Sequence, residues 1–233
     1  MKKTLFTALA TGMLTLLFIA VCFAYNPGQR TFKVLGEDLN SDKHAVHLVV
    51  QQKIDMADIL TAEAYNKLAN AQKIRHVRTE YNEMNGINSE FVTITDGDGK
   101  IISQSNTFVK GGYWYTIDYV NKTYDRLPEL PGMSMPFAET LISWFANRPE
   151  GGYDEATGYD YDKVTKGNNE LNFYFEKDTD KWVGYEVSYL PMFTVVEYNQ
   201  TVNPEQAFAL PPADFKQVPN QAMRNYANKL MGY

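Results

Sequence analysis

The stretch from Phe91 to Leu127 constrains the fold more than any other part of the chain. The segments between its apolar runs are rich in Gly, Asp and Asn, which accept the backbone conformations that tight hairpins need. β-Branched and aromatic side chains suit the surface of a pleated sheet. The stretch therefore predicts an antiparallel meander. Its predicted strands are Phe91–Thr95, Ile101–Val109, Tyr113–Tyr119 and Thr123–Leu127.

Further runs with a two-residue period flank this meander. Before it, Ala45–Asp55 alternates apolar and polar side chains, a pattern typical of a strand with one buried face. After it, a second meander is predicted over residues 158–202, and we interpret its paired carboxylates Asp160 and Asp162 as a solvated face. The strands predicted in the second meander are Gly158–Thr165, Leu171–Glu176, Trp182–Leu190 and Phe193–Val202.

The segment between the first strand and the first meander has two interpretations. Ile59–Lys67 and Lys73–Asn82 are predicted as two strands around the turn Leu68–Ala71. The alternative is that the first of them begins a helix, with Thr61 as its cap and Ala, Glu, Lys and Leu following.

An apolar helix is predicted between the two meanders, over residues 137–148. Pro136 stands where a helix can begin, and large apolar side chains then recur at helical spacing. A long antiparallel sheet must curl, because each pair of strands twists. We therefore predict a mainly β (α+β) fold: a large curled antiparallel sheet, or half-open β-barrel, with this helix covering the concave face.

The first 24 residues predict export from the cytoplasm. Lys2 and Lys3 precede the largely apolar run Leu5–Val21, and small residues follow it, which is the pattern of a secretory signal peptide. The mature protein is then expected in the periplasm or cell envelope. Two alternatives remain, an uncleaved N-terminal membrane anchor and a lipid anchor through Cys22, the only cysteine.

The rest of the chain is interpreted as one folded domain. Residues 25–44 are a lead-in segment, residues 45–217 form the curled sheet with its helix, and residues 218–233 form a C-terminal helical piece. The formal net charge is −6, which argues against nucleic acid as a partner, because phosphate backbones attract basic surfaces.

No familiar catalytic motif occurs in the sequence: there is no Gly-x-Ser-x-Gly, no His-Glu-x-x-His and no phosphate-binding glycine loop. His44, His47 and His76 lack the spacing of a metal site. The segment Asp96–Gly99 fits a hairpin turn better than a calcium loop, since the twelfth position is Thr107 and not Glu. We expect no enzyme, no cofactor and no metal.

Three short phrases resemble a known family. They are Lys110–Asp118 with Asn121–Tyr124, then Leu171–Thr179, and finally Phe208–Pro211. In these phrases and in their order the chain is similar to the LolA/LolB-like superfamily, the bacterial outer-membrane lipoprotein carriers and their lipid-binding relatives. The resemblance implies a half-open barrel whose helices plug an apolar cavity. It also implies a lipid or lipoprotein acyl chain as ligand, with a membrane-associated receptor or partner protein as a second partner.

The candidate ligand-binding residues are large and apolar, and they are also compatible with an ordinary core. Two hypotheses about function differ in whether these residues bind a ligand or fill the core. One is an exported, non-catalytic envelope protein that binds or carries a lipid or acyl chain in an apolar cavity. The other is an envelope interaction or regulatory module with a filled core. The candidates are Phe137, Leu141, Trp144 and Phe145 on the helix and Tyr113, Tyr115 and Tyr119 on a strand.

Overall fold

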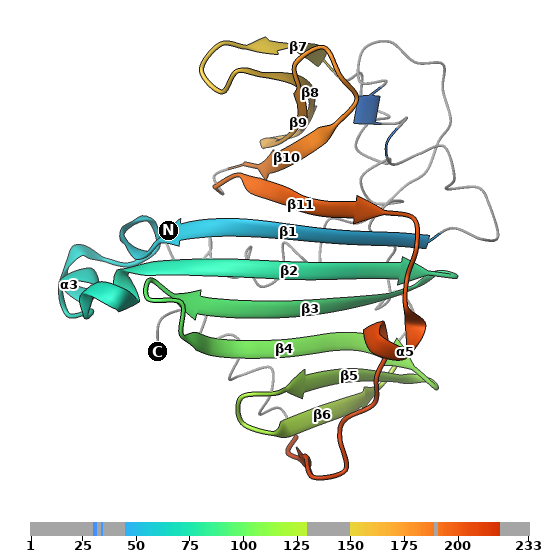
Figure 1. Cartoon of the computed structure of the whole chain (residues 1–233). Coiled ribbons are helices and arrows are strands. Elements are labelled where there is room, and N and C mark those ends of the chain that lie inside the picture. The colour runs from blue at the N-terminus through green and yellow to red at the C-terminus, as the bar shows by residue number, and fades with distance from the viewer. Residues whose placement is uncertain (1–29, 32–33, 35–44, 130–149, 189–190, 220–233) are drawn as a thin grey trace.

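The computed structural model describes residues 30–31, 34, 45–129, 150–188 and 191–219. Within them a 12-stranded sheet curls without closing, so the predicted mainly β, curled-sheet fold is confirmed (Figure 1). The strands are β1 (Ala45–Asp55), β2 (Ile74–Met84), β3 (Ile87–Asp96), β4 (Ile101–Lys110), β5 (Tyr113–Asp118), β6 (Thr123–Pro128), β7 (Glu150–Asp154), β8 (Tyr159–Lys166), β9 (Asn169–Glu176), β10 (Trp182–Val187), β11 (Phe193–Asn199) and β12 (Lys216–Gln217).

The strand order shows how the two meanders join. It runs β12-β6-β5-β4-β3-β2-β1-β11-β10-β9-β8-β7. Strand β1 pairs with β2 on one side and with β11 on the other, so it is the seam between the two meanders. The short edge strand β12 pairs in parallel with β6, whereas the other pairs are antiparallel.

Bulges increase the curl of this sheet, because an extra residue in one strand bends it and raises its twist. The register shifts between Val49 and Val50 where β1 meets β11, and between Trp182 and Gly184 where β10 meets β9. Gly184 leaves room for a close approach: a Cβ atom there would lie 2.6 Å from the carbonyl oxygen of Phe193. A larger residue at this position would therefore force the neighbouring strand away.

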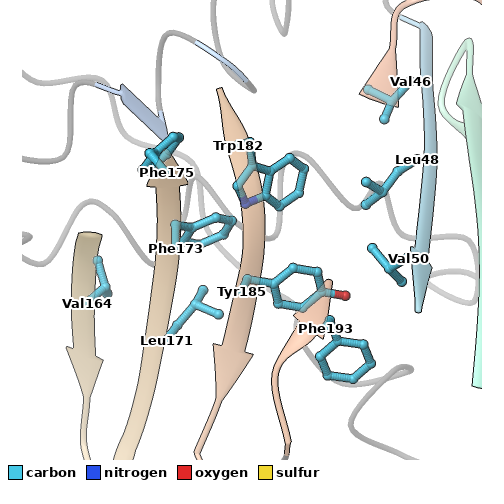
Figure 2. Packing of buried hydrophobic residues seen from close by; sticks show 10 residues of the cluster. All are labelled: Val46, Leu48, Val50, Val164, Leu171, Phe173, Phe175, Trp182, Tyr185 and Phe193. Carbon is cyan, nitrogen blue, oxygen red and sulfur yellow. The ribbon is translucent and has the colours of Figure 1, made fainter. Parts of the chain in front are cut away.

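The two faces of the sheet can be followed from β1. We call the inner face the side on which Val46, Leu48 and Val50 lie, and the outer face the side that carries His47. The three inner side chains are at most 2% exposed. They belong to one cluster with Val164 of β8, although β11, β10 and β9 separate the two strands in the sheet (Figure 2). The inner face is therefore the concave one.

The C-terminal segment covers part of the outer face. After β11 the chain crosses the sheet to the short helix α5 (Pro204–Ala207) and continues to β12 beside β6 (Figure 1). Ala207 and Phe208 are buried against Phe108 of β4. The Nδ2 atom of Asn106 donates to the carbonyl of Ala207 (3.1 Å), and Lys110 Nζ donates to that of Phe208 (2.7 Å).

The strand predicted over Ile59–Lys67 is wrong, and the helical alternative holds. Helix α3 (Ala62–Asn66) occupies this segment, between the 3₁₀ turns Met56–Asp58 and Asn70–Lys73. The Thr61 hydroxyl accepts a hydrogen bond from the amide of Ala64 at 3.3 Å, so a local cap outweighs the weak apolar alternation. The strand predicted over Lys73–Asn82 is confirmed as β2.

Two features of the sheet were not predicted. One is strand β7, which includes Gly151 and Gly152. A Cβ atom on Gly152 would lie 3.1 Å from the Tyr161 hydroxyl, so the glycine lets β7 lie against that ring. The hairpin between β2 and β3 turns at Asn85 and Gly86, whose φ angles are 53° and 75°.

Several predictions fall on residues outside the described part of the chain. They are the signal peptide 1–24, the helix 137–148 and residues 220–233 of the C-terminal helical piece predicted over 218–233. Within the described residues, no helix has the length and apolar character needed to cross a membrane.

Candidate ligand-binding face

One half of the inner face is a continuous apolar surface rich in aromatic rings. Its side chains come from β1 and from β8 to β11, and Figure 2 shows those of β1 pointing toward those of β10 and β11. Tyr185 and Phe193 stack with ring centroids 4.8 Å apart. Phe173 and Trp182 lie 5.6 Å apart. We call this set the aromatic half: Val46, Leu48, Val50, Val164, Leu171, Phe173, Phe175, Trp182, Tyr185 and Phe193.

Local sequence places these rings on one side of the sheet. In β9, alternate residues Leu171, Phe173 and Phe175 are each fully buried. Trp182 and Tyr185 are three residues apart, so a regular strand would send them to opposite faces. The bulge between Trp182 and Gly184 brings both to the inner face. The Trp182 indole N–H donates to the carbonyl of Gly184 at 2.8 Å, which satisfies its polar atom.

Asp160 and Asp162 lie on the inner face of β8, so the prediction that they are solvated is wrong. They are 7% and 4% exposed. Arg30 forms an ion pair with Asp160 at 2.6 Å, and the amide and hydroxyl of Thr31 donate to Asp162. The two carboxylates hold Arg30 and Thr31 against the sheet, and these long-range contacts have no signal in the strand pattern.

The two carboxylates titrate in opposite directions. Burial opposes ionisation of Asp160, but hydrogen bonds from the amide of Asp178 and from Arg30 outweigh it and lower its pKa. Burial dominates at Asp162 and raises its pKa. The contacts of Asp160 and Asp162 give both side chains a structural role, which is to anchor Arg30 and Thr31.

The other half of the inner face, over β4 to β6, is largely polar, although Val109 and Trp114 also lie on it. Ser103, Ser105, Thr116, Asp118 and Asp125 are all buried. The change of character is visible along single rows of paired residues. One such row reads Val50, Thr79, Val92, Ser105 and Asp118. The concave side therefore joins an apolar half to a half in which hydroxyls and carboxylates predominate, which we call the polar half.

Glu90 of β3 lies between these two halves. It pairs with Tyr81 on one side and with Thr107 on the other. Burial raises its pKa to about 7. Burial also raises the pKa of Tyr185 in the aromatic half, and the charge of Glu90 adds to that effect. Glu90 thus acts electrostatically across the concave face, from β3 to β10.

Arg75 and Arg78 of β2 lie on opposite faces of the sheet. Arg75 is 4% exposed on the inner face, where its register partner is Asp96. Burial lowers its pKa, and the Asp96 carboxylate opposes that change. Arg78 lies on the outer face, with a guanidinium nitrogen 3.4 Å from Glu80.

The three predicted strand tyrosines are not part of the aromatic half. Tyr115 lies on the outer face, stacks on Phe108 at 5.3 Å and packs against Phe208 of the C-terminal segment. Tyr119 contacts Phe215 at 5.7 Å. Tyr113 is 39% exposed. Their role toward a ligand stays a prediction, as does that of Phe137, Leu141, Trp144 and Phe145, which lie outside the described residues.

The residues that form the aromatic half were missed as site candidates, although the sequence contains a signal for them. The run Leu171–Phe175 alternates large apolar side chains with polar or amphipathic ones. The sequence did not indicate that side chains of β1 pack in the same cluster as this run.

Metal ligands do not gather in the described part of the chain, where no group of three or more His, Cys, Asp or Glu side chains is placed to hold an ion. Asp96–Gly99 is the predicted hairpin turn. The Asp96 carboxylate accepts hydrogen bonds from the amides of Asp98 and Lys100, at 3.1 and 3.0 Å.

Comparison with known proteins leaves the family open. No protein-family model matches the chain, and no curated protein matches it. Among solved structures, an uncharacterized conserved protein from Thermus thermophilus is similar at 10% identity and a TM-score of 0.42, over 82% of this chain and 98% of that one. PNGF-II is similar in two crystal forms, at 6% and 8% identity and TM-scores of 0.28 and 0.30. The match covers 80% of this chain but about a third of PNGF-II, 33% and 34% in the two crystal forms.

Proposed function

We propose that this protein is an exported, non-catalytic carrier of the cell envelope that binds a lipid or lipoprotein acyl chain on the inner face of its curled sheet. The observation that carries the proposal is the aromatic half, a concave apolar surface built from five adjacent strands. Ligand pockets for apolar molecules are concave and lined mainly by hydrophobic and aromatic side chains.

The polar half of the same face supports an amphipathic ligand. An acyl chain placed along Phe173, Trp182 and Phe193 would be removed from water, at roughly 0.8 kcal/mol for each buried methylene group. Its polar end would lie toward the half of the face over β4 to β6, where hydroxyl and carboxylate side chains are more frequent. The leader pattern of residues 1–24 and the resemblance to the LolA/LolB-like superfamily agree with this role in the periplasm or envelope.

Tryptophan fluorescence tests the proposal at a defined place. The chain has three tryptophans, so the double variant W114F/W144F retains only Trp182 in the aromatic half. A fatty acid brominated near its methyl end quenches an indole that it touches. We expect saturable quenching of Trp182, and none with the unbrominated fatty acid.

The matched control is W144F/W182F, which retains only Trp114 on the inner face of β5. Its fluorescence should fall much less, because Trp114 lies outside the aromatic half. Native mass spectrometry of the protein purified from cells gives a second measurement, in which we expect a co-purifying lipid. Absence of both a bound lipid and saturable quenching of Trp182 would refute the carrier function.

The second candidate is an envelope interaction or regulatory module with a filled core. The observation that favours it is the contact among the rings themselves, since Tyr185 and Phe193 already stack at 4.8 Å and every member of the aromatic half is at most 7% exposed. The same measurements separate the two functions, because a filled core leaves Trp182 inaccessible to brominated lipid.

A further inference from the structure

A polar cavity of about 360 Å³ lies on the outer face, on the opposite side of the sheet from the aromatic half. This volume is within the range of roughly 300 to 1,000 Å³ that is usual for small-molecule sites. Its walls come from β1, β2, β11, α5 and the segment that leads into α5. The lining residues are His47, Glu80, Asn82, Glu197, Asn199, Thr201, Asn203, Gln206 and Ala207.

Strand register builds the floor of this cavity from two adjacent rows. In the first row, His47 pairs with Asn82 on one side and with Asn199 on the other. In the second row, Val49 of β1 separates Glu80 from Glu197. A carboxylate therefore stands on each side of the β1 strand, with the imidazole beside them.

Hydrogen bonds set the orientation of the His47 ring. Its Nδ1 atom lies 2.7 Å from the amide oxygen of Asn82, which only accepts, so Nδ1 carries the proton. The Asn82 amide nitrogen donates in turn to the hydroxyl of Ser89. In the neutral ring, Nε2 is then an acceptor. It lies 3.8 Å from Glu197 Oε1, which also only accepts, so neither atom donates to the other and a ligand donor can bind to Nε2.

The remaining wall is held in place by the packing under α5. Ala207 and Phe208 are buried with Phe108, and Asn106 donates to the carbonyl of Ala207. This anchoring positions Gln206 over the floor without a contribution from the ligand. A preformed wall lowers the entropy cost of binding.

Charge selects the class of ligand. The described residues that line the cavity include two carboxylates and no Lys or Arg. Arg78 approaches one oxygen of Glu80 at 3.4 Å from outside the lining, so Glu197 has the less compensated charge. Carboxylates and an imidazole nitrogen are acceptors, and the amides of Gln206 and Asn203 add mixed polar groups.

We propose that this cavity binds a small amino sugar, with its ammonium group between Glu80 and Glu197 and its hydroxyl groups on His47 Nε2 and the amides. Asn199 Nδ2 donates to one oxygen of Glu197 (3.0 Å) and Arg78 lies 3.4 Å from one oxygen of Glu80. The ammonium supplies further donors to these carboxylates and a positive charge that no Lys or Arg of the described lining provides. The hydroxyl groups donate to the imidazole and both donate to and accept from the amides. The site faces away from the inner face, so its occupation does not depend on an acyl ligand.

Ligand-detected NMR titration of the full chain tests the site with three probes. Glucosamine has both the ammonium and the hydroxyl groups, glucose has only the hydroxyls, and putrescine has only ammonium groups. We expect saturable binding of glucosamine, and binding of the other two at least about tenfold weaker, which corresponds to a loss of about 1.4 kcal/mol.

The variants E197Q and E80Q should each weaken glucosamine binding by about tenfold, since each removes a negative charge that would accept from the ammonium group. The matched control is E205Q, which alters an exposed glutamate of α5 outside the lining. Thermal unfolding confirms that each variant folds, and the two glutamates test the site independently. Equal binding of glucose, equal binding of putrescine, no saturable glucosamine signal, or unchanged affinity in both variants would each overturn the proposal.

Discussion

Replacement of Glu90 by Gln should stabilise the protein at alkaline pH and leave its stability nearly unchanged at acid pH. Glu90 is partly buried between the aromatic and polar halves of the inner face. Burial raises its pKa from the ordinary value of 4.5 to about 7. Gln keeps the size and shape of the side chain and removes its ability to ionise.

The size and the sign of the change in the free energy of unfolding follow from this pKa. An acid whose pKa is raised by folding binds its proton more tightly in the folded state, so the folded state is favoured while the group is protonated. Stability is unaffected below pH 4.5, falls as the pH rises toward 7, and is constant above that value. Each pH unit across this interval lowers the free energy of unfolding by about 1.4 kcal/mol. Ionisation of Glu90 therefore lowers the free energy of unfolding by up to about 3 kcal/mol.

Urea unfolding followed by circular dichroism measures this cost. At about pH 8, Glu90→Gln should raise the free energy of unfolding by up to about 3 kcal/mol, and at about pH 4 the two proteins should agree closely. The control Glu205→Gln alters an exposed side chain and should change stability little at either pH. The reasoning would be refuted if Glu90→Gln did not raise the free energy of unfolding at the higher pH. It would also be refuted if the gain were the same at both pH values.

Three further substitutions test the packing and the anchoring contacts. Phe173→Ala removes a fully buried ring and should lower the free energy of unfolding by about 3 to 5 kcal/mol in urea titrations. Its control is Val196→Ala, at a site that is 53% exposed. This control should change the free energy of unfolding by less than about 0.5 kcal/mol. Asp160→Asn should destabilise the protein by about 1 kcal/mol at neutral pH through weaker bonds to Arg30 and Asp178. Because the pKa of Asp160 is lowered by folding, that difference should vanish as the pH falls through its folded pKa, and a constant difference would contradict the ion pair. Gly184→Ala should cost about 1 to 3 kcal/mol by overpacking, and Met192→Ala should not rescue it, because the carbonyl of Phe193 still lies 2.6 Å from the new Cβ.

Much of the strand content could be predicted because alternation and turn residues are local signals. The runs Ala45–Asp55 and Ile101–Val109 correspond to β1 and β4, and the predicted face of Val46, Leu48 and Val50 is the buried one. Prediction failed over Ile59–Lys67, where apolar residues are too few to decide and a Thr61 cap favours a short helix. It also failed at β7, where Gly152 is accepted because it fits against the Tyr161 ring.

The candidate site was predicted less well than the strands. Tyr113, Tyr115 and Tyr119 share a face, as the alternation indicates, but no local pattern says which face of a strand is concave. That depends on the direction of curl and on the C-terminal segment, which covers Tyr115 through Phe208. The burial of Asp160 depends likewise on Arg30, which lies far earlier in the chain.

The sequence by itself determined that this chain forms a large antiparallel sheet, because period-two alternation and glycine-rich turns act over a few residues at a time. It also determined the acidic charge and the N-terminal pattern that predicts export. Only the tertiary structure decided that β1 joins the two meanders, that rings from β9, β10 and β11 meet β1 on the concave side, and that His47, Glu80 and Glu197 line one cavity. These arrangements arise from strand pairing and bulges between segments far apart in the chain, and that pairing is settled by the packing of the whole sheet.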